Sequence, residues 1–146
     1  MFIGCAGAQL SLRSAGLRNP FGIDRRKGVR SYGQFLSRGR RAVERGWWII
    51  LFPEGTRVTP GRRVPYKSGG ARFAVAVECD VLPVAINSGH CWGRNEFGKT
   101  PGLITVSFGP VIRTAGKSAR EVNEEVEAWI EGEMEAIEPL ENDGAC

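Results

Sequence analysis

One short run of apolar residues limits the folds that this chain can adopt. Trp47 to Phe52 are six consecutive aromatic or aliphatic residues, and Pro53 follows them directly. A run of this length that stops at a proline is typical of a strand buried on both faces of an α/β sheet. A membrane-spanning helix needs roughly 20 apolar residues. The sequence therefore predicts an α/β fold without a membrane-spanning segment.

Helices and strands are expected to alternate along the rest of the chain. Apolar residues recur at helical spacing over 30–45, where Gly46 ends the pattern, and again from Gly69 to Glu78. Val81 to Ile86 predicts a second buried strand, and Leu103 to Phe108 alternates as a third. This order predicts a central, mostly parallel sheet with flanking helices.

A capping box begins the last predicted helix. Ser118 and Glu121 have the spacing at which a serine hydroxyl and a glutamate carboxylate each accept a hydrogen bond from the other residue's backbone N–H group. Beyond them, apolar residues line one helical face and glutamates the other, which predicts a solvated outer face. The apolar face consists of Val122, Val126, Trp129, Ile130, Met134 and Ile137.

Charge is divided unevenly between the two halves of the sequence. Residues 1–72 hold 15 Lys and Arg against 3 Asp and Glu, whereas residues 73–146 hold 5 against 13. A basic half indicates an anionic partner, which could be nucleic acid, a phosphorylated small molecule or an acidic membrane surface. Charge alone does not choose among these partners.

The segment F-P-E-G-T-R carries the clearest chemical pattern in the chain. It follows the apolar run directly, and ligands of α/β sheets bind at the carboxyl ends of strands. Gly55 allows a turn or a close approach to a ligand, and the guanidinium of Arg57 offers a planar fork suited to phosphate. The alternative interpretation is a turn at a strand end, with Glu54 and Arg57 forming a surface ion pair.

Three other segments lie before and after this signature, in a fixed order along the chain. Gly22 to Arg25 precedes it, Tyr66 to Ala71 follows it, and Val81 to Ile86 contributes V-L-P-V-A-I further on. In this order the four segments resemble those of the glycerolipid acyltransferase family, over about residues 17–137. We accordingly divide the chain into an unassigned start (1–16), a partial acyltransferase-like domain (17–138) and a frayed C-terminal tail (139–146).

The resemblance implies transfer of an acyl group to the free hydroxyl of lysophosphatidate, giving phosphatidate. The donor would be a thioester of coenzyme A or of acyl carrier protein as co-substrate, with no bound cofactor and no metal. Peripheral attachment at the inner, cytoplasmic face of an anionic membrane would suit such a lipid substrate and the basic half. The implied site has three parts: Arg25, Glu54, Gly55, Thr56 and Arg57 for the phosphate and glycerol, Pro83 on the acyl-donor side, and Arg26, Arg62, Arg63 and Lys67 as additional anion contacts.

The sequence departs from the family pattern at the catalytic element. The family uses an H-x-x-x-x-D pair upstream of the first arginine block, in which the histidine removes the proton of the acceptor hydroxyl. The chain has one histidine, His90, which lies downstream of that block and has Asn95 at the aspartate position. We therefore name no catalytic base. We expect that the N-terminal part of the family domain is lacking and that the chain alone is inactive or very weak.

Three other functions fit parts of the sequence. Gly93 to Thr100 satisfies the phosphate-loop pattern G-x-x-x-x-G-K-(S/T), but Pro101 follows where the required helix should begin. A basic nucleic-acid-binding module could use aromatic residues such as Tyr32 and Trp48 for base stacking, although these fall at predicted core positions. The third alternative is a non-catalytic remnant that only binds ligand.

Overall fold

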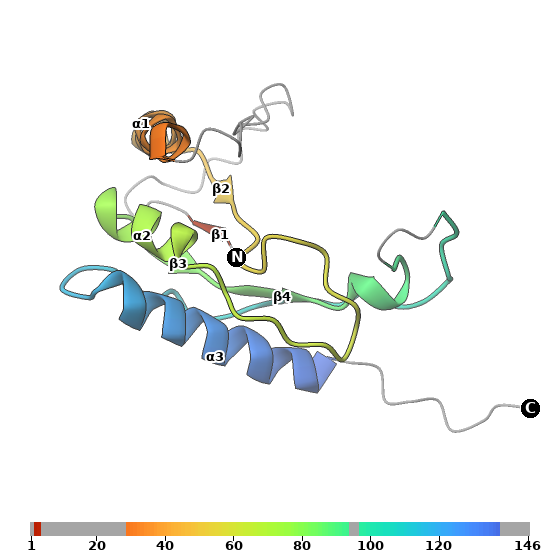
Figure 1. The fold of residues 1–146 in the computed structure, drawn as a ribbon. Coiled ribbons are helices and arrows are strands. Elements are labelled where there is room, and N and C mark those ends of the chain that lie inside the picture. Colours follow the sequence, from red (N-terminus) through yellow and green to blue (C-terminus); the bar gives the residue numbers. More distant parts are fainter. Residues whose placement is uncertain (1, 4–28, 94–96, 138–146) are drawn as a thin grey trace, which may run out of the picture.

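The computed structural model describes residues 2–3, 29–93 and 97–137 as a layer of helices packed on short strands (Figure 1). The predicted helices are confirmed, with small differences at their ends. The elements in chain order are β1 (Phe2–Ile3), α1 (Val29–Glu44), β2 (Ile49–Ile50), α2 (Gly69–Ala76), β3 (Val81–Leu82), β4 (Val84–Ile86), the 3₁₀ turn η2 (Ser88–His90), β5 (Val106–Phe108) and α3 (Ala119–Ile137).

The three helices form one contiguous layer. Helix α1 crosses α2 at Gly39, where a side chain would collide with the ring of Phe73. The rings of Phe35 and Phe73 lie 4.8 Å apart, and Phe73 itself is fully buried. Helix α2 in turn packs against α3, which runs along β4 (Figure 1). The core therefore lies between the helices and one face of the strands.

The strand pairs that the structure describes are antiparallel. β1 lies between β2 and β3, with Phe2 opposite Ile50 and Leu82, and β4 pairs with β5 in the same antiparallel sense. β2 and β3 run parallel to each other, but β1 separates them. The expectation of a mostly parallel sheet is wrong for these pairs, because a two-residue strand from the unassigned start occupies the position between the two parallel strands.

The apolar run of 47–52 is less buried than its composition predicts. Only Ile49 and Ile50 form a strand. Ile49 is buried, with 5% of its surface exposed, and Leu51 packs against the same core while partly buried. Ile50 is 53% exposed and Phe52 is 69% exposed. The prediction of a strand buried on both faces is wrong here, since the described residues provide helices on one side of the strand.

Two other predicted strands are shorter in the structure. Pro83 divides the run of 81–86 into β3 and β4, because proline has no N–H group to donate. Its carbonyl still accepts a hydrogen bond from the Gly109 N–H at 3.0 Å. Of the predicted strand 103–108, only Val106 to Phe108 is paired. The side chains of Val106 and Phe108 point away from α3, whereas the Ser107 hydroxyl donates to Glu133 on α3 at 2.6 Å.

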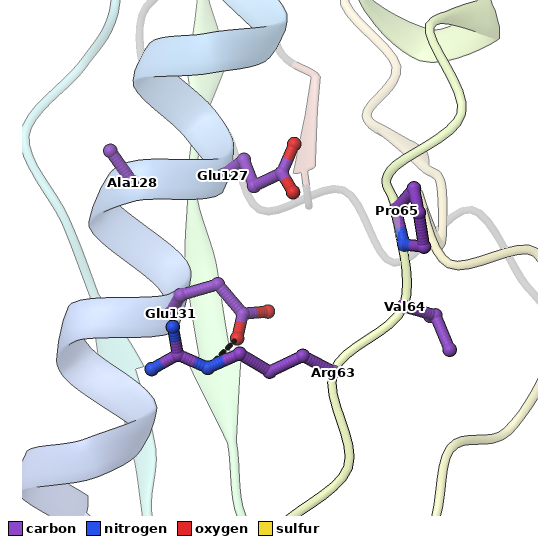
Figure 2. Close-up of a pocket in the computed structure, with 6 residues that line it drawn as sticks. All are labelled: Arg63, Val64, Pro65, Glu127, Ala128 and Glu131. Atoms are coloured by element: carbon purple, nitrogen blue, oxygen red, sulfur yellow. Dashed lines mark ion pairs between the residues drawn. The ribbon is translucent and has the colours of Figure 1, made fainter.

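Helix α3 is attached to the rest of the domain on its glutamate-rich side as well. The segment 63–65 runs beside it, and the Arg63 guanidinium forms an ion pair with Glu131 at 3.1 Å (Figure 2). Arg63 also forms an ion pair with Glu135. These side chains are partly or largely exposed, so each pair adds about 1 kcal/mol at most. The predicted solvated face of α3 is therefore partly covered by a loop.

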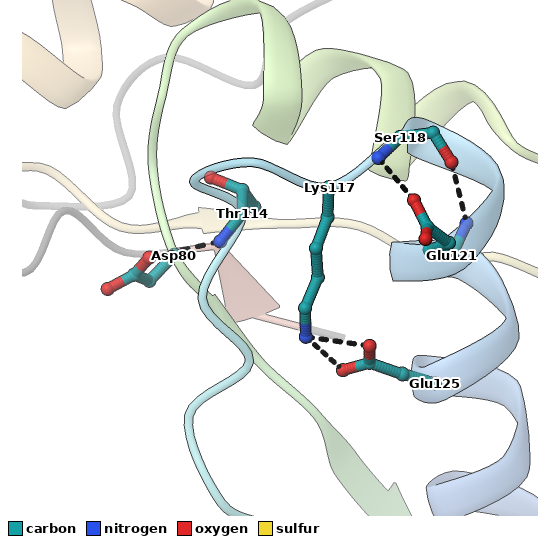
Figure 3. Close-up of polar contacts among 6 residues, drawn as sticks. All are labelled: Asp80, Thr114, Lys117, Ser118, Glu121 and Glu125. Atoms are coloured by element: carbon teal, nitrogen blue, oxygen red, sulfur yellow. Dashed lines mark hydrogen bonds and ion pairs between the residues drawn. The ribbon is translucent and has the colours of Figure 1, made fainter.

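The start of α3 has the predicted capping box (Figure 3). The Glu121 N–H donates to the Ser118 hydroxyl at 3.2 Å, and the Ser118 N–H donates to the Glu121 carboxylate at 2.7 Å. These bonds lower the pKa of Glu121. Lys117 adds an ion pair with Glu125 at 2.6 Å, which holds the preceding loop on the first turns of the helix.

The apolar face of α3 completes the core, since Val122, Val126 and Ile130 are buried. Within the described part of the chain, no helix combines the length and the apolar character that crossing a bilayer requires.

Candidate functional site

The segment F-P-E-G-T-R forms a tight turn directly after β2. The Gly55 N–H donates to the Phe52 carbonyl at 3.0 Å, and Gly55 adopts a φ of +70°, which favours glycine. The Lys67 N–H donates to the Pro53 carbonyl at 2.9 Å, so the following segment lies against the turn. A Cβ atom on Gly55 would lie 2.5 Å from Lys67 Nζ. Two sequence-predicted residues, Gly55 and Lys67, are therefore in direct contact.

Glu54 lies on the side of the turn that faces α3. Burial raises the pKa of its carboxyl group, and the nearby carboxylate of Glu131 acts in the same direction. Tyr66 is buried in the same region, and among the described residues its hydroxyl has no hydrogen-bond partner of acceptable geometry. Burial, together with Glu131 and Glu54, raises the pKa of the Tyr66 hydroxyl. This environment favours a neutral Tyr66 and disfavours further negative charge.

Arg57 points toward a loop that is distant in the sequence. Its Cζ atom lies 4.9 Å from the ring centre of Trp92. The same indole ring has Lys99 Nζ at 4.8 Å from its centre. Cation–π contacts at such exposed positions stabilise the arrangement by about 0.5–1 kcal/mol each. The structure therefore places the predicted phosphate-binding arginine and Lys99, a residue of the phosphate-loop pattern, around one indole ring.

The loop that carries Trp92 is anchored at its base by Asn87, which is 4% exposed. The Asn87 side-chain amide donates to the Ile137 carbonyl at 2.9 Å, and its carbonyl oxygen accepts a hydrogen bond from the Thr105 N–H at 2.7 Å. Further along, the Thr100 N–H donates to the Cys91 carbonyl at 2.9 Å. These bonds tie both ends of the loop to each other and to the end of α3.

A pocket of about 420 Å³ lies between the segment 63–65 and α3 (Figure 2). Glu127 and Glu131 line the helix side, and Arg63 lines the other side, where it is paired with Glu131. An anionic ligand would meet two carboxylates here. The electrostatics of this pocket therefore do not favour the predicted anion contact at Arg63, which instead joins the loop to α3.

The remaining predicted site residues fall into two groups. Arg25 and Arg26 lie outside the described residues, so the expected pairing of Arg25 with Arg57 stays a prediction. Pro83 is fully buried, and a Cβ atom on Gly109 would lie 2.8 Å from its Cγ atom, so Pro83 is a core residue. Its place on the acyl-donor side also stays a prediction. Thr56, within the turn, and Arg62 are exposed.

The phosphate-loop pattern lacks the helix that its chemistry requires. Residues 99–105 have no regular secondary structure, and the next element is β5. His90 ends η2 and is exposed, two residues before Trp92. Asn95 lies outside the described residues. In the described part of the chain no group of acidic, histidine or cysteine side chains has the arrangement of a metal site.

Sequence reasoning missed three residues that shape this site. Trp92 and Asn87 have no motif around them, and their roles depend on contacts across the fold. Lys99 was seen only as part of the phosphate-loop pattern. Because six residues separate Trp92 from Lys99 in the sequence, no local pattern signals that these two side chains meet.

Comparison with known proteins identifies the domain. Residues 19–87, which include the F-P-E-G-T-R turn, match the family model described as Acyltransferase. The chain is 34% identical over 128 residues to a 1-acyl-sn-glycerol-3-phosphate acyltransferase of Pseudomonas aeruginosa, which covers 86% of this chain and 50% of that protein. A protein of the same name from Cocos nucifera is 28% identical over 133 residues, covering 88% of this chain and 43% of that protein.

The fold agrees with these matches. The crystal structure of the 1-acyl-sn-glycerophosphate acyltransferase PlsC from Thermotoga maritima superposes with a TM-score of 0.68 and 25% identity, covering 78% of this chain and 46% of that chain. Fold and signature together define an α/β acyltransferase domain. The chain belongs to the glycerolipid acyltransferase family. It spans about half the length of the curated relatives that it matches.

Proposed function

We propose that the chain binds lysophosphatidate at the F-P-E-G-T-R turn and functions as the acceptor-binding part of an acyltransferase of phospholipid biosynthesis. The reaction would transfer an acyl group from acyl-coenzyme A or acyl carrier protein to 1-acylglycerol 3-phosphate. The observation that carries this proposal is the turn itself, in which the Lys67 ammonium lies against Gly55, two residues before Arg57, within the segment that matches the family. The relatives named above, which are 1-acyl-sn-glycerol-3-phosphate acyltransferases, support the same substrate class.

The local chemistry suits a phosphomonoester. The guanidinium of Arg57 can donate two parallel hydrogen bonds to phosphate oxygens, each worth about 1.5–3 kcal/mol. Gly55 has no side chain to keep a ligand away from the backbone, and the Lys67 ammonium lies directly against it. Burial raises the pKa of the Glu54 carboxyl.

The transfer step requires more than this site. The acceptor hydroxyl oxygen forms an ester bond with the thioester carbonyl carbon, the carbon–sulfur bond breaks, and a base accepts the hydroxyl proton. The 146 residues contain one histidine, His90, and no H-x-x-x-x-D pair. We therefore expect these residues alone to bind the acceptor but to transfer acyl groups very slowly or not at all.

The location of the substrate implies a membrane surface as a partner. Basic residues attract an anionic lipid surface by about 1 kcal/mol each, and this attraction is screened by salt. We propose peripheral binding at the cytoplasmic face of such a membrane. Binding to vesicles that contain phosphatidylglycerol should decrease as salt is raised, and equal binding to neutral vesicles would contradict the proposal.

Calorimetric titration with a short-chain lysophosphatidate below its micellar concentration tests the acceptor site. We expect saturable binding by the wild-type chain and at least about a tenfold loss in Arg57→Ala, since one charge-assisted hydrogen bond is worth that much. Arg45→Ala is the matched control, because Arg45 is an exposed arginine after the end of α1 and should leave binding unchanged. Equal binding by all three chains would refute the site.

A further inference from the structure

We propose that Trp92 is a positioning residue for the acceptor phosphate and that Lys99 is a second cationic contact for it. This inference rests on the proposed function, since Arg57 is taken as the first contact. The carrying observation is that one indole ring holds both cations, with Arg57 Cζ at 4.9 Å and Lys99 Nζ at 4.8 Å from its centre. Two points that lie this close to one ring centre are within about 10 Å of each other.

A cation–π contact with Trp92 is compatible with hydrogen bonding from Arg57 to a ligand. A guanidinium that lies over an aromatic ring uses its planar face, and its N–H groups remain free at the edge for hydrogen bonds to phosphate. Without Trp92 the exposed Arg57 side chain would sample many rotamers, and binding would have to restrict that freedom. The ring therefore orders the cation before the ligand arrives.

The loop that carries Trp92 is itself attached to the site. A Cβ atom on Gly89 would lie 3.1 Å from Pro60, so η2 packs directly on the segment that follows Arg57. The hydrogen bond from the Thr100 N–H to the Cys91 carbonyl holds the residue next to Lys99 close to the residue next to Trp92. Lys99 is thus placed by the fold and not by a nucleotide-binding loop.

The test measures binding of three probes to variants of the intact 146-residue chain. The probes are short-chain lysophosphatidate, the matching monoacylglycerol, which lacks the phosphate, and coenzyme A, which represents the donor's phosphates. The variants are Trp92→Ala, Trp92→Phe and Lys99→Gln. The control is Tyr32→Ala, which removes the cation–π partner of Arg72 at a distance from the site.

We expect Trp92→Ala and Lys99→Gln each to weaken lysophosphatidate binding by about two- to fivefold, the equivalent of one exposed cation–π or ionic contact. Trp92→Phe should lose less, because it keeps an aromatic ring beside Arg57 and Lys99. Monoacylglycerol binding should not change, and Tyr32→Ala should behave as wild type. Since Trp92 is 46% exposed, none of these changes should prevent folding, which circular dichroism would verify.

Each failure has a different meaning. If the wild-type chain binds and Arg57→Ala does not, but Trp92→Ala and Lys99→Gln bind as wild type, the inference is wrong and the proposed function stands. If Trp92→Ala weakens monoacylglycerol equally, Trp92 contacts the acyl chain and is not a positioning residue. If only coenzyme A binding is weakened, the two cations serve the donor and the acceptor assignment is overturned. If Arg57→Ala has no effect, the proposed function itself is wrong.

Discussion

Replacement of Gly55 by alanine, compared with a control glycine, separates two roles of Gly55: its contribution to stability through the backbone conformation of the turn, and its contribution to ligand binding. At φ +70° an alanine side chain costs about 1–2 kcal/mol. The new Cβ atom would also lie 2.5 Å from Lys67 Nζ, the mobile end of an exposed side chain that can move away at small cost. We therefore expect Gly55→Ala to lower the free energy of unfolding by about 1–2 kcal/mol, with the fold retained.

Gly116→Ala is the matched control, since Gly116 has a φ of +75° and open space around an added Cβ atom. Urea unfolding followed by tryptophan fluorescence should show similar losses for both variants. Calorimetry should then show that Gly55→Ala alone weakens lysophosphatidate binding, by about tenfold or more, because the methyl group displaces the Lys67 ammonium. Wild-type stability in both variants would refute the backbone argument, and wild-type binding by Gly55→Ala would refute the placement of the ligand.

The other predictions concern the base of the loop, the pH response and the core. Asn87→Ala should lower the free energy of unfolding by about 1–3 kcal/mol, because two backbone groups lose buried partners, and an unchanged urea midpoint would contradict this. The pKa of the Glu54 carboxyl is higher in the folded chain than in the unfolded chain, so the unfolded chain releases this proton at lower pH. The free energy of unfolding of the wild-type chain should therefore fall, relative to that of Glu54→Gln, from about pH 4.5 upward. A stability difference that stays constant with pH would oppose that assignment. Phe73→Ala should cost about 3–5 kcal/mol and Phe108→Ala about 0.5 kcal/mol, and similar losses would show that the outer strand face is covered.

The helices could be predicted from the sequence because each has a local signal. Gly46, with a φ of +74°, ends α1 where expected, and the bonds between Ser118 and Glu121 begin α3 where expected. The strands were harder to predict. The composition of the run 47–52 indicates how much apolar surface the segment could bury. How much of it is buried depends on which elements lie on each face of the sheet.

The turn at the candidate site could also be predicted, because Pro53 has a fixed φ and Gly55 can adopt the positive φ that the turn requires. Its surroundings could not be predicted, since they depend on residues that are distant in the sequence. Arg57 and Lys99 contact the same Trp92 ring only because the loop that carries Trp92 packs on the segment after the turn. Arg63 faces the glutamates of α3 for a similar reason, as the register of that helix sets which carboxylates the loop meets.

The central claim is that the F-P-E-G-T-R turn holds the phosphate of lysophosphatidate. A crystal structure of the chain with this lipid bound tests the claim most directly. We predict phosphate oxygens at about 2.7–2.9 Å from the guanidinium nitrogens of Arg57, with the ring of Trp92 still beneath that guanidinium. A phosphate bound elsewhere, with Arg57 and Lys67 making no contact to it, would contradict the account.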